Sequence, residues 1–480
     1  MIEKIDTQKT GRKVPSKQVA AYGFMTGSAN IVGVAKNLYL FVYITDEFGL
    51  QLELFILANL LFFAYNALND VLFGIYADRT RHKLGRRIPY IRYGSLFIVV
   101  TNMLIWFPWP GTYFGVPDAG VINKFIQYLV YLFAMDTVMT IINVSINAWL
   151  PEATESEEER TKMSLINKMS ILIGGLFVLI VPMIYNEGGL DVFRVFLLIG
   201  NTINALCLFV GSFIIKERPE LYKTSFKDIS TKEIFKQFAS LYKKKAFLSS
   251  IIFGFATATM VMLLNNYPKQ LGYGLGLENG ELWVQAIFYI SHYGMLPVLS
   301  LMVKSKPVDK VIVNIIKYGL VLSVVLFSMS IILNNPLILW PFVGVAGAMA
   351  TVGLYGPLIG GNAIDQDELD TGERREALYG GAGALITIPT AQIVGSLVAG
   401  GLILINYQEG VGFAQADSVF AGIRFLFFII IFISGILTLI AIKIYPFKGD
   451  ALVTLKKDLI ELHKKKEASA TPNQESFPKS

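Results

Sequence analysis

The sequence predicts an all-α membrane protein with twelve spanning helices, arranged as six and six. Hydrophobic residues make up 54% of the 480 residues and charged residues only 16%, and the mean hydropathy is +0.53. Apolar runs of about 20 residues, which is the length that a helix needs to cross about 30 Å of hydrocarbon, recur along the chain. One long basic connection separates six of these runs from six more.

The apolar runs place the spans along the whole chain. Glycine and proline interrupt several runs, and such breaks are tolerated where neighbouring helices satisfy the backbone. The expected spans are 20–45, 51–77, 90–108, 121–149, 163–186, 192–215, 246–266, 281–303, 311–333, 336–362, 376–405 and 418–446. The corresponding domains are an N-terminal tail (1–19), a first bundle (20–215), a linker (216–245), a second bundle (246–446) and a polar tail (447–480).

The linker and the tail have different patterns. Ser230 and Glu233 form a Ser-x-x-Glu capping box, and apolar residues follow it at helical spacing. This pattern predicts an amphipathic helix lying on the inner membrane surface. The tail from Lys456 onward is polar enough to be disordered.

Positive charge predicts the orientation of the spans. Alternate connections, starting with the N-terminal tail, hold 36 of the 42 lysines and arginines. Because such residues are enriched in cytoplasmic loops, both termini are expected in the cytoplasm, with the chain in the cell membrane. The net charge of +6 then reflects topology and contact with anionic lipid, and no nucleic acid partner is expected.

Residues suited to catalysis or metal binding are sparse. The single cysteine, Cys207, excludes an intramolecular disulfide. His82, His292 and His463 are too dispersed for a metal site of the HExxH kind, and no nucleophile has a plausible base. We therefore expect neither an enzyme nor a bound cofactor.

Charged residues within the second span are the main candidates for function. Asp70, Gly74 and Asp78 are four residues apart and share one helix face, with Asn66 one turn above. An ionisable group in hydrocarbon costs about 3 kcal/mol or more unless it faces a cavity or a partner. Asp70 is therefore either a functional acid or a buried structural one. The basic run that follows Asp78 is either a gate of charge-assisted bonds or a loop that fixes topology.

Four motifs in this order resemble one family. They are "YGF…YITDEFGL" (22–50), "NALNDVLFGIYADRTRHKLGRRIPYI" (66–91), "NAWLPEATESEEER" (147–160) and "DQDELDTGERREALYGG" (365–381). The chain resembles the glycoside–pentoside–hexuronide cation symporters of the major facilitator superfamily. This resemblance implies two six-helix bundles that rock around a central site. It also implies a cytoplasmic gate, which would consist of Asp78, Arg79, Arg81, Arg86 and Arg87.

The resemblance places a cation-coupling site on the second span, at Asn66, Asn69 and Asp70. Sodium-coupled members carry two acids one turn apart there, whereas this chain has Asn66 and Asp70. Two further family positions are apolar here, Phe133 and Ile388. Because a hard cation needs several oxygen ligands, we expect H⁺ coupling through Asp70, or uncoupled transport, rather than Na⁺ coupling.

The resemblance also implies a substrate site formed by Asn30, Asp136 and Lys168, to which this chain adds Lys36. Asn30 stands where the family has a sugar-binding acid, and Asp136 keeps the second acid. Losing one acid and gaining a lysine makes the pocket more positive, which weakly favours an anionic solute such as a hexuronide. Lys168 lies near a span end, where it can instead snorkel to the interface.

The sequence therefore predicts a monomeric secondary transporter for a sugar, a glycoside or a related polar solute. Two alternatives stay open. One is an uncoupled carrier or a carrier of another solute, such as a lysolipid-like amphiphile. The other is a membrane receptor or scaffold that uses the same fold without transport.

Overall fold

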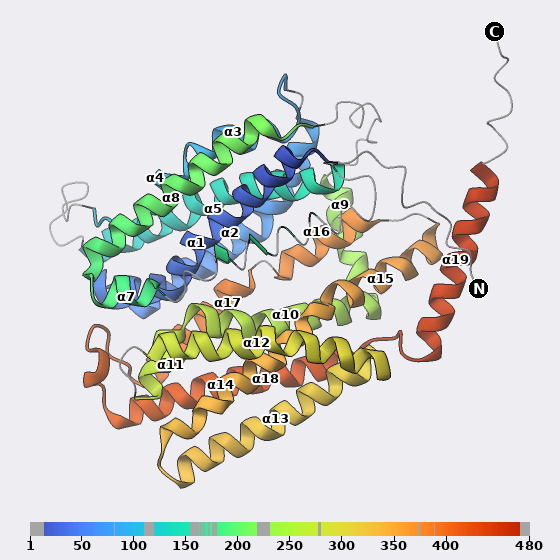
Figure 1. Ribbon diagram of the computed structural model, residues 1–480. Coiled ribbons are helices and arrows are strands. Elements are labelled where there is room, and N and C mark those ends of the chain that lie inside the picture. Colours follow the sequence, from blue (N-terminus) through green and yellow to red (C-terminus); the bar gives the residue numbers. More distant parts are fainter. Residues whose placement is uncertain are drawn as a thin grey trace. The chain divides into compact units, whose positions relative to one another are not determined.

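The computed structural model is built from helices, and the residues it describes form no strand (Figure 1). The described residues are 14–80, 82–109, 120–153, 180–217, 231–276, 280–372, 375–387 and 389–470, with isolated positions between 163 and 174. Several side chains inside the described helices are not described, among them those of Asp70, Asp78 and Arg79. Arg81, Lys168, Ser230 and Ile388 lie outside the described residues.

Helices occupy the predicted spans of the first half. They are α1 (Ser16–Val42) with a π-helical turn (Tyr43–Glu47), α2 (Leu52–Arg79), α3 (Ile88–Ser95), α4 (Ile98–Met103), α5 (Gly120–Ala153), α7 (Val181–Asn186) and α8 (Gly189–Ile214). The third span is divided between α3 and α4, although the sequence predicts one run. Most of the fifth span lies outside the described residues, and α7 is its end.

The second half repeats this pattern with more interruptions. Its helices are α10 (Lys245–Asn266), α11 (Pro268–Gly274), α12 (Gly280–Ser305), α13 (Val308–Ile332), α14 (Trp340–Ala350), α15 (Gly356–Thr371), α16 (Glu376–Thr387), α17 (Thr390–Leu404) and α18 (Asp417–Ile444). A 3₁₀ turn, Thr351–Tyr355, joins α14 to α15, and Pro357 follows at the start of α15. Within the described chain, eight helical segments are long and apolar enough to cross a membrane.

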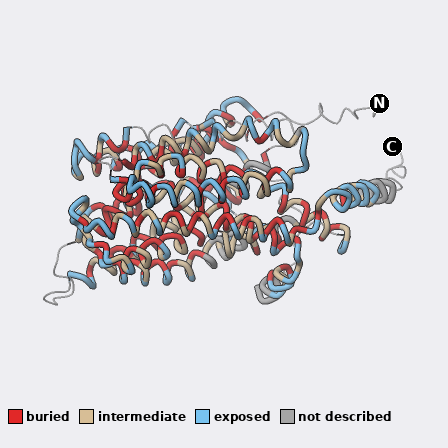
Figure 2. Tube along the Cα trace, turned by 90° about the horizontal axis from the view of Figure 1, so that it is seen from below, coloured by how far each residue is buried: buried red, intermediate tan, exposed pale blue. Residues whose placement is uncertain are grey.

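The outward faces of these helices are apolar. Buried and exposed residues alternate along the helices in Figure 2, because one face packs against neighbours and another does not. Large apolar side chains stand on the exposed faces, including Ile332 at 79%, Ile290 at 74% and Tyr318 at 73% exposure. Exposed apolar surface of this extent is typical of contact with lipid.

Contacts divide the chain into two compact units that differ from the predicted domains. Unit 1 comprises Met1–Lys227, Met262–Ala286 and Ala391–Leu426. Unit 2 comprises Asp228–Val261, Ile287–Thr390 and Phe427–Ser480. Unit 1 therefore holds two segments from the second half of the chain. The five domains given by the sequence stay predictions.

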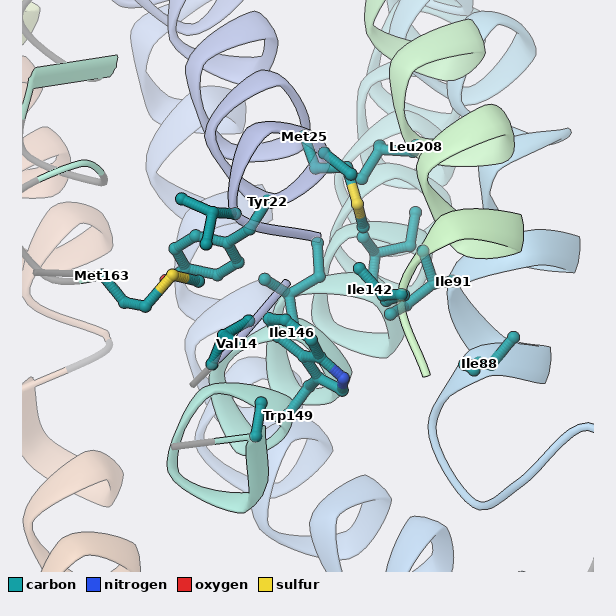
Figure 3. Packing of buried hydrophobic residues seen from close by; sticks show 14 of the residues in the cluster. Val14, Tyr22, Met25, Ile88, Ile91, Ile142, Ile146, Trp149, Met163 and Leu208 are labelled. Atoms are coloured by element: carbon teal, nitrogen blue, oxygen red, sulfur yellow. The ribbon is translucent and has the colours of Figure 1, made fainter. Parts of the chain in front are cut away.

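The core of unit 1 lies where α1, α3, α5 and α8 meet. Tyr22 and Met25 of α1 are each 1% exposed, and Trp149 of α5 is equally buried. Figure 3 shows Met25 beside Leu208 and Ile142, with Trp149 next to Val14 and Ile146. The Trp149 indole also donates to the backbone oxygen of Lys216 at 3.0 Å, which satisfies its polar atom.

Two helices outside the spans belong to unit 2. The linker contains α9 (Thr231–Leu241), and its apolar residues Phe238 and Leu241 are buried, with Phe238 facing Gly381 of α16. The sequence placed this apolar face on the membrane surface, whereas Phe238 and Leu241 of that face are buried by protein.

The expectation of a disordered tail from Lys456 onward is wrong over α19 (Asp450–Ala470). This helix runs across the direction of α18 (Figure 1). Leu455 is buried and Lys456 bonds Asp365 of α15 at 2.6 Å. Leucines at 452, 455, 459 and 462 share one helical face. The average polarity of this segment does not reveal the apolar face, because lysines surround the leucines in the sequence.

Close packing of α8 on α1 predicts the effect of Gly211→Ala. A methyl group at Gly211 would lie 2.4 Å from Met25 Sδ, inside the packed core. We expect a lower apparent melting temperature in detergent, since overpacking costs about 1–3 kcal/mol. Gly294→Ala of α12 is the control, because its methyl group would meet no atom within 4 Å. Equal melting temperatures for the two variants would contradict this account of the helix packing.

Candidate functional site

Three of the predicted residues form one polar cluster in unit 1. Asn69 of α2 donates through Nδ2 to Asp136 Oδ2 of α5 at 3.0 Å. Lys36 of α1 interacts electrostatically with Asp136, and its Nζ lies 3.8 Å from Met135 Sδ. All three side chains are half-buried. We call Lys36, Asn69 and Asp136 the Asp136 cluster.

The Asp136 cluster joins two sets of residues that the sequence treated separately. Asn69 was assigned to cation coupling, and Lys36 and Asp136 were assigned to substrate binding. Because a thioether is a weak acceptor, Met135 does not compensate the Lys36 charge, whereas Asp136 offsets part of it electrostatically. A carboxylate and an amide of the packed pair α2 and α5 therefore share their surroundings with an ammonium of α1.

Asn30 borders a separate cavity that shares α1 and α5 with the Asp136 cluster. The cavity has a volume of about 280 Å³ and is lined by α1, α5 and α8, including Asn30, Asn143 and Asn204. Asn30 Nδ2 donates to the Thr26 carbonyl at 2.8 Å, and Asn204 Oδ1 accepts from Ser28. Neither Lys36 nor Asp136 lines this cavity. Asn143 is nevertheless about two helical turns from Asp136 on α5.

Asn66 has different neighbours from Asn69. It is 4% exposed, and its Nδ2 lies 3.5 Å from Gln392 Oε1 of α17. Its Oδ1 has no hydrogen-bond partner among the described residues. Asp70 lies within α2, and its side chain is not described. The predicted coupling set is therefore divided, with Asn66 toward α17 and Asn69 toward α5.

The backbone at the predicted gate surrounds a carboxylate. Glu217, just after α8, accepts from the backbone amides of Arg86, Arg87 and Ile88 at 2.7, 2.6 and 2.6 Å. Gly85 has φ +113°, and a Cβ there would lie 2.6 Å from Glu217 Cδ. The N-terminus of α3 thus receives a negative charge, which its dipole and its free amides favour.

The side chains of Arg86 and Arg87 are buried, at 8% and 6% exposure. The sequence placed them on a solvated loop or in a side-chain gate. Asp78 and Arg79 lie at the end of α2 with side chains that are not described, and Arg81 lies outside the described residues. The gate role of these five residues stays a prediction.

An ion-pair network occupies unit 2. Asp367 has no exposed side-chain surface, and it accepts two bonds from Arg375, at 2.8 and 2.6 Å, and one from Lys244 at 2.5 Å. Asp367 lies near the end of α15, and Arg375 and Lys244 directly precede α16 and α10. A buried carboxylate of this kind needs several donors. The motif that carried the family resemblance therefore has a structural role here.

A second polar cluster in unit 1 contains residues that the sequence analysis missed. Glu281 of α12 is 3% exposed and accepts through Oε1 from Tyr39 at 3.0 Å and from Asn186 at 2.8 Å. Lys269 of α11 lies over the rings of Tyr39, Tyr185 and Tyr273, at 5.6, 5.0 and 6.0 Å. We call Tyr39, Tyr185, Asn186, Lys269 and Glu281 the Lys269 cluster.

Burial lowers the pKa of Lys269, and the nearby carboxylates of Glu281, Asp46 and Glu47 raise it in part. Tyr39 and Tyr185 stack at 4.0 Å between ring centroids. Cation–π contact is favourable for a desolvated ammonium. In the sequence, Lys269 differs from most lysines and arginines only in lying outside the basic connections. Nothing in the sequence pairs it with tyrosines from other helices.

No group of three or more His, Cys, Asp or Glu side chains in the described chain could hold a metal ion. The chemistry of the two clusters is hydrogen bonding and charge pairing. Both kinds of interaction suit a polar solute that carries hydroxyl groups.

Comparison with known proteins identifies relatives along most of the chain. A family model described as MFS/sugar transport protein matches residues 21–449. An uncharacterized symporter of Synechocystis is 27% identical over 158 residues, 32% of this chain and 27% of the relative. The isoprimeverose transporter of Lactiplantibacillus pentosus is 23% identical over 182 residues, 37% of this chain and 36% of that protein.

A sodium-dependent lysophosphatidylcholine symporter of Xenopus tropicalis is 27% identical over 142 residues, 28% of this chain and 25% of the relative. The matched stretches thus span about a quarter to a third of these relatives. The solved structure of a D-xylose-proton symporter aligns with a TM-score of 0.58 at 13% identity, covering 91% of this chain and 97% of that one. This likeness shows the major facilitator fold, and it confirms the fold class that the sequence predicts.

The Glu217 site predicts a stability effect. Glu217→Ala removes the carboxylate that three backbone amides share, so we expect a loss of about 1–3 kcal/mol and a lower apparent melting temperature. Amide hydrogen exchange at Arg86–Ile88 is expected to rise at the same time. Glu187→Ala, an exposed acid in the same unit, is the control. Unchanged exchange at these amides would refute the assigned role of Glu217.

Proposed function

Because the chain belongs to the family of MFS/sugar transport proteins, we propose that it moves a sugar, a glycoside or a related polar solute across the membrane by alternating access. The observation that carries the proposal is the match of the family model over residues 21–449. The members compared are transporters, so the expectation that the chain is not an enzyme is confirmed at the level of the family.

The Asp136 cluster supports this proposal as the central binding site. Its carboxylate accepts from sugar hydroxyls, while the Lys36 ammonium and the Asn69 amide donate to them. These groups come from α1, α2 and α5, where exposure of a charge to hydrocarbon would cost about 3 kcal/mol or more. In secondary transporters of the major facilitator fold, the substrate site lies near the middle of the membrane, at the interface between the structural repeats.

The solute is proposed to be neutral. The sequence favoured an anion because Lys36 adds a positive charge and Asn30 stands in place of an acid. In the structure Asp136 interacts electrostatically with Lys36 and offsets part of that charge. A site in which one ammonium faces one carboxylate recognises hydroxyl groups without preferring a uronide.

Coupling to H⁺ through Asp70 is proposed in preference to Na⁺ coupling. Asn66 faces Gln392 and Asn69 faces Asp136, so the two amides do not converge on one ion. A hard cation would then lack the several oxygen ligands that it needs. A single carboxylate, in contrast, is sufficient to carry a proton.

The membrane location, the orientation of the termini and the oligomeric state are part of the same proposal. We place the protein in the cell membrane as a monomer, with both termini in the cytoplasm, because the basic connections alternate. The first alternative solute is a lysolipid-like amphiphile, which the similarity to a lysophosphatidylcholine symporter favours. The uptake experiment below tests it. A receptor or scaffold without transport is the other alternative.

Asp136→Asn tests the central site. We expect proteoliposomes with this variant to take up the preferred sugar at least about tenfold more slowly, because a charge-assisted hydrogen bond is worth about 1.5–3 kcal/mol. The panel is isoprimeverose, D-xylose, a methyl glucoside and the matched glucuronide. The variant should also bind the glucuronide relatively better, since Lys36 is left without its acid. Glu187→Gln is the control.

Uptake of no panel sugar by the wild type would refute the proposed function. Uptake of lysophosphatidylcholine alone would establish the amphiphile instead. A stronger preference of the wild type for the glucuronide than for the glucoside would refute the neutral solute.

Asp70→Asn tests the coupling ion. With an imposed proton gradient, the wild type is expected to accumulate sugar and the variant only to equilibrate it, since an amide does not titrate. Uptake is measured with a proton gradient, with a sodium gradient and with neither. Accumulation by the variant equal to that of the wild type would make Asp70 structural. Accumulation driven by sodium alone would refute H⁺ coupling.

A further inference from the structure

A cavity beside the Lys269 cluster is not part of the central site. Its volume is about 380 Å³, within the range of about 300–1,000 Å³ that is usual for small-molecule sites. Its walls include Tyr185, Asn186, Lys269, Tyr273, Glu281 and Phe413. All of these residues belong to unit 1. None belongs to the Asp136 cluster, nor to the cavity of Asn30.

One wall of this cavity has an unsatisfied polar atom. Tyr185 is 7% exposed, and its hydroxyl has no hydrogen-bond partner among the described residues. Its ring is held by stacking on Tyr39, with centroids 4.0 Å apart. Buried hydroxyls are nearly always paired, so an unpaired one at a cavity wall indicates a partner that comes from outside the chain.

The other walls specify the chemistry of that partner. Glu281 offers a carboxylate that is 3% exposed and fixed by Tyr39 and Asn186, and Lys269 offers an ammonium. Tyr273 and Phe413 form an edge-to-face pair, with centroids 4.9 Å apart. The Glu281 carboxylate disfavours binding of an anion. The two charged groups, Glu281 and Lys269, disfavour binding of a hydrocarbon chain. Hydrogen-bonding groups next to aromatic rings fit a neutral molecule with several hydroxyl groups and one apolar face.

We propose that this cavity is a second binding site for a neutral sugar or glycoside, separate from the Asp136 cluster. The proposal rests on the proposed function, because the ligand is the same class of solute. Tyr185 donates its hydroxyl hydrogen to the sugar, Glu281 and Lys269 bind ring hydroxyls, and Phe413 and Tyr273 contact the apolar face.

The position of the site gives it a role in transport. Its walls come from α7 of the first half and from α11 and α12 of the second half, which unit 1 joins at this point. A bound sugar competes for the groups that connect these segments, namely Glu281 and Lys269. Occupancy of the cavity therefore weakens the connection through which the two halves are held together here.

Binding to full-length protein in nanodiscs tests the second site. The probe is the panel sugar with the highest uptake, and affinity is measured by calorimetry in an Asp136→Asn background that weakens the central site. We expect residual binding there, and we expect Tyr185→Phe to weaken it about three- to tenfold, the value of one hydrogen bond. Tyr131→Phe is the matched control, because this buried tyrosine of α5 also has a hydroxyl with no hydrogen-bond partner in the described part of the chain.

The outcomes separate this inference from the proposed function. Transport by the wild type, with no residual binding in the Asp136→Asn background, would overturn the second site alone. Equal effects of Tyr185→Phe and Tyr131→Phe on residual binding would also overturn it. If the wild type neither transports nor binds any sugar of the panel, the proposed function itself is overturned. A Phe413→Ala variant that weakens residual binding as Tyr185→Phe does would support the site through a wall that makes no hydrogen bond.

Discussion

The pairing of polar groups inside an apolar helix assembly is the constraint on which the rest of this protein depends. Asp136, Lys36 and Asn69 come from three helices that are otherwise lined with hydrocarbon side chains. Each group alone would be expensive in such surroundings, whereas together they offset one another. The polar interactions connect side chains of α1, α2 and α5, and hydroxyl-bearing molecules can form hydrogen bonds with the same groups.

Each unit also contains a carboxylate that bonds several donors near helix ends. In unit 1, Glu217 after α8 binds the backbone at the start of α3. In unit 2, Asp367 near the end of α15 binds Arg375 before α16 and Lys244 before α10. One buried carboxylate thus connects a helix end to a helix start in each unit. The first uses backbone amides and Gly85, and the second uses side-chain cations, so the two units reach a similar result with different groups.

Much of the fold could be predicted from the sequence, because apolar runs and basic connections report directly on spans and their ends. The run at 90–108 shows the limit, since its division into α3 and α4 depends on packing that hydropathy does not measure. Asp136 was selected as a candidate site residue through the family resemblance, and its binding role stays a prediction. Its pairing with Lys36 could not be predicted, since that contact joins residues 100 positions apart. Glu217 and Glu281 were missed for the same reason, because both are ordinary acids at the ends of runs until the chain folds.

The Lys269 cluster depends on segments that lie far apart in the sequence. A buried ammonium among three tyrosine rings is stable only while α1, α7 and α11 stay together, because each supplies part of its surroundings. If one segment moves away, Lys269 regains water and its ring contacts are lost, and Glu281 loses its bonds from Tyr39 and Asn186. The cluster is therefore a set of contacts that is either complete or absent. Sets of contacts of this kind are found where packed segments switch between two discrete arrangements.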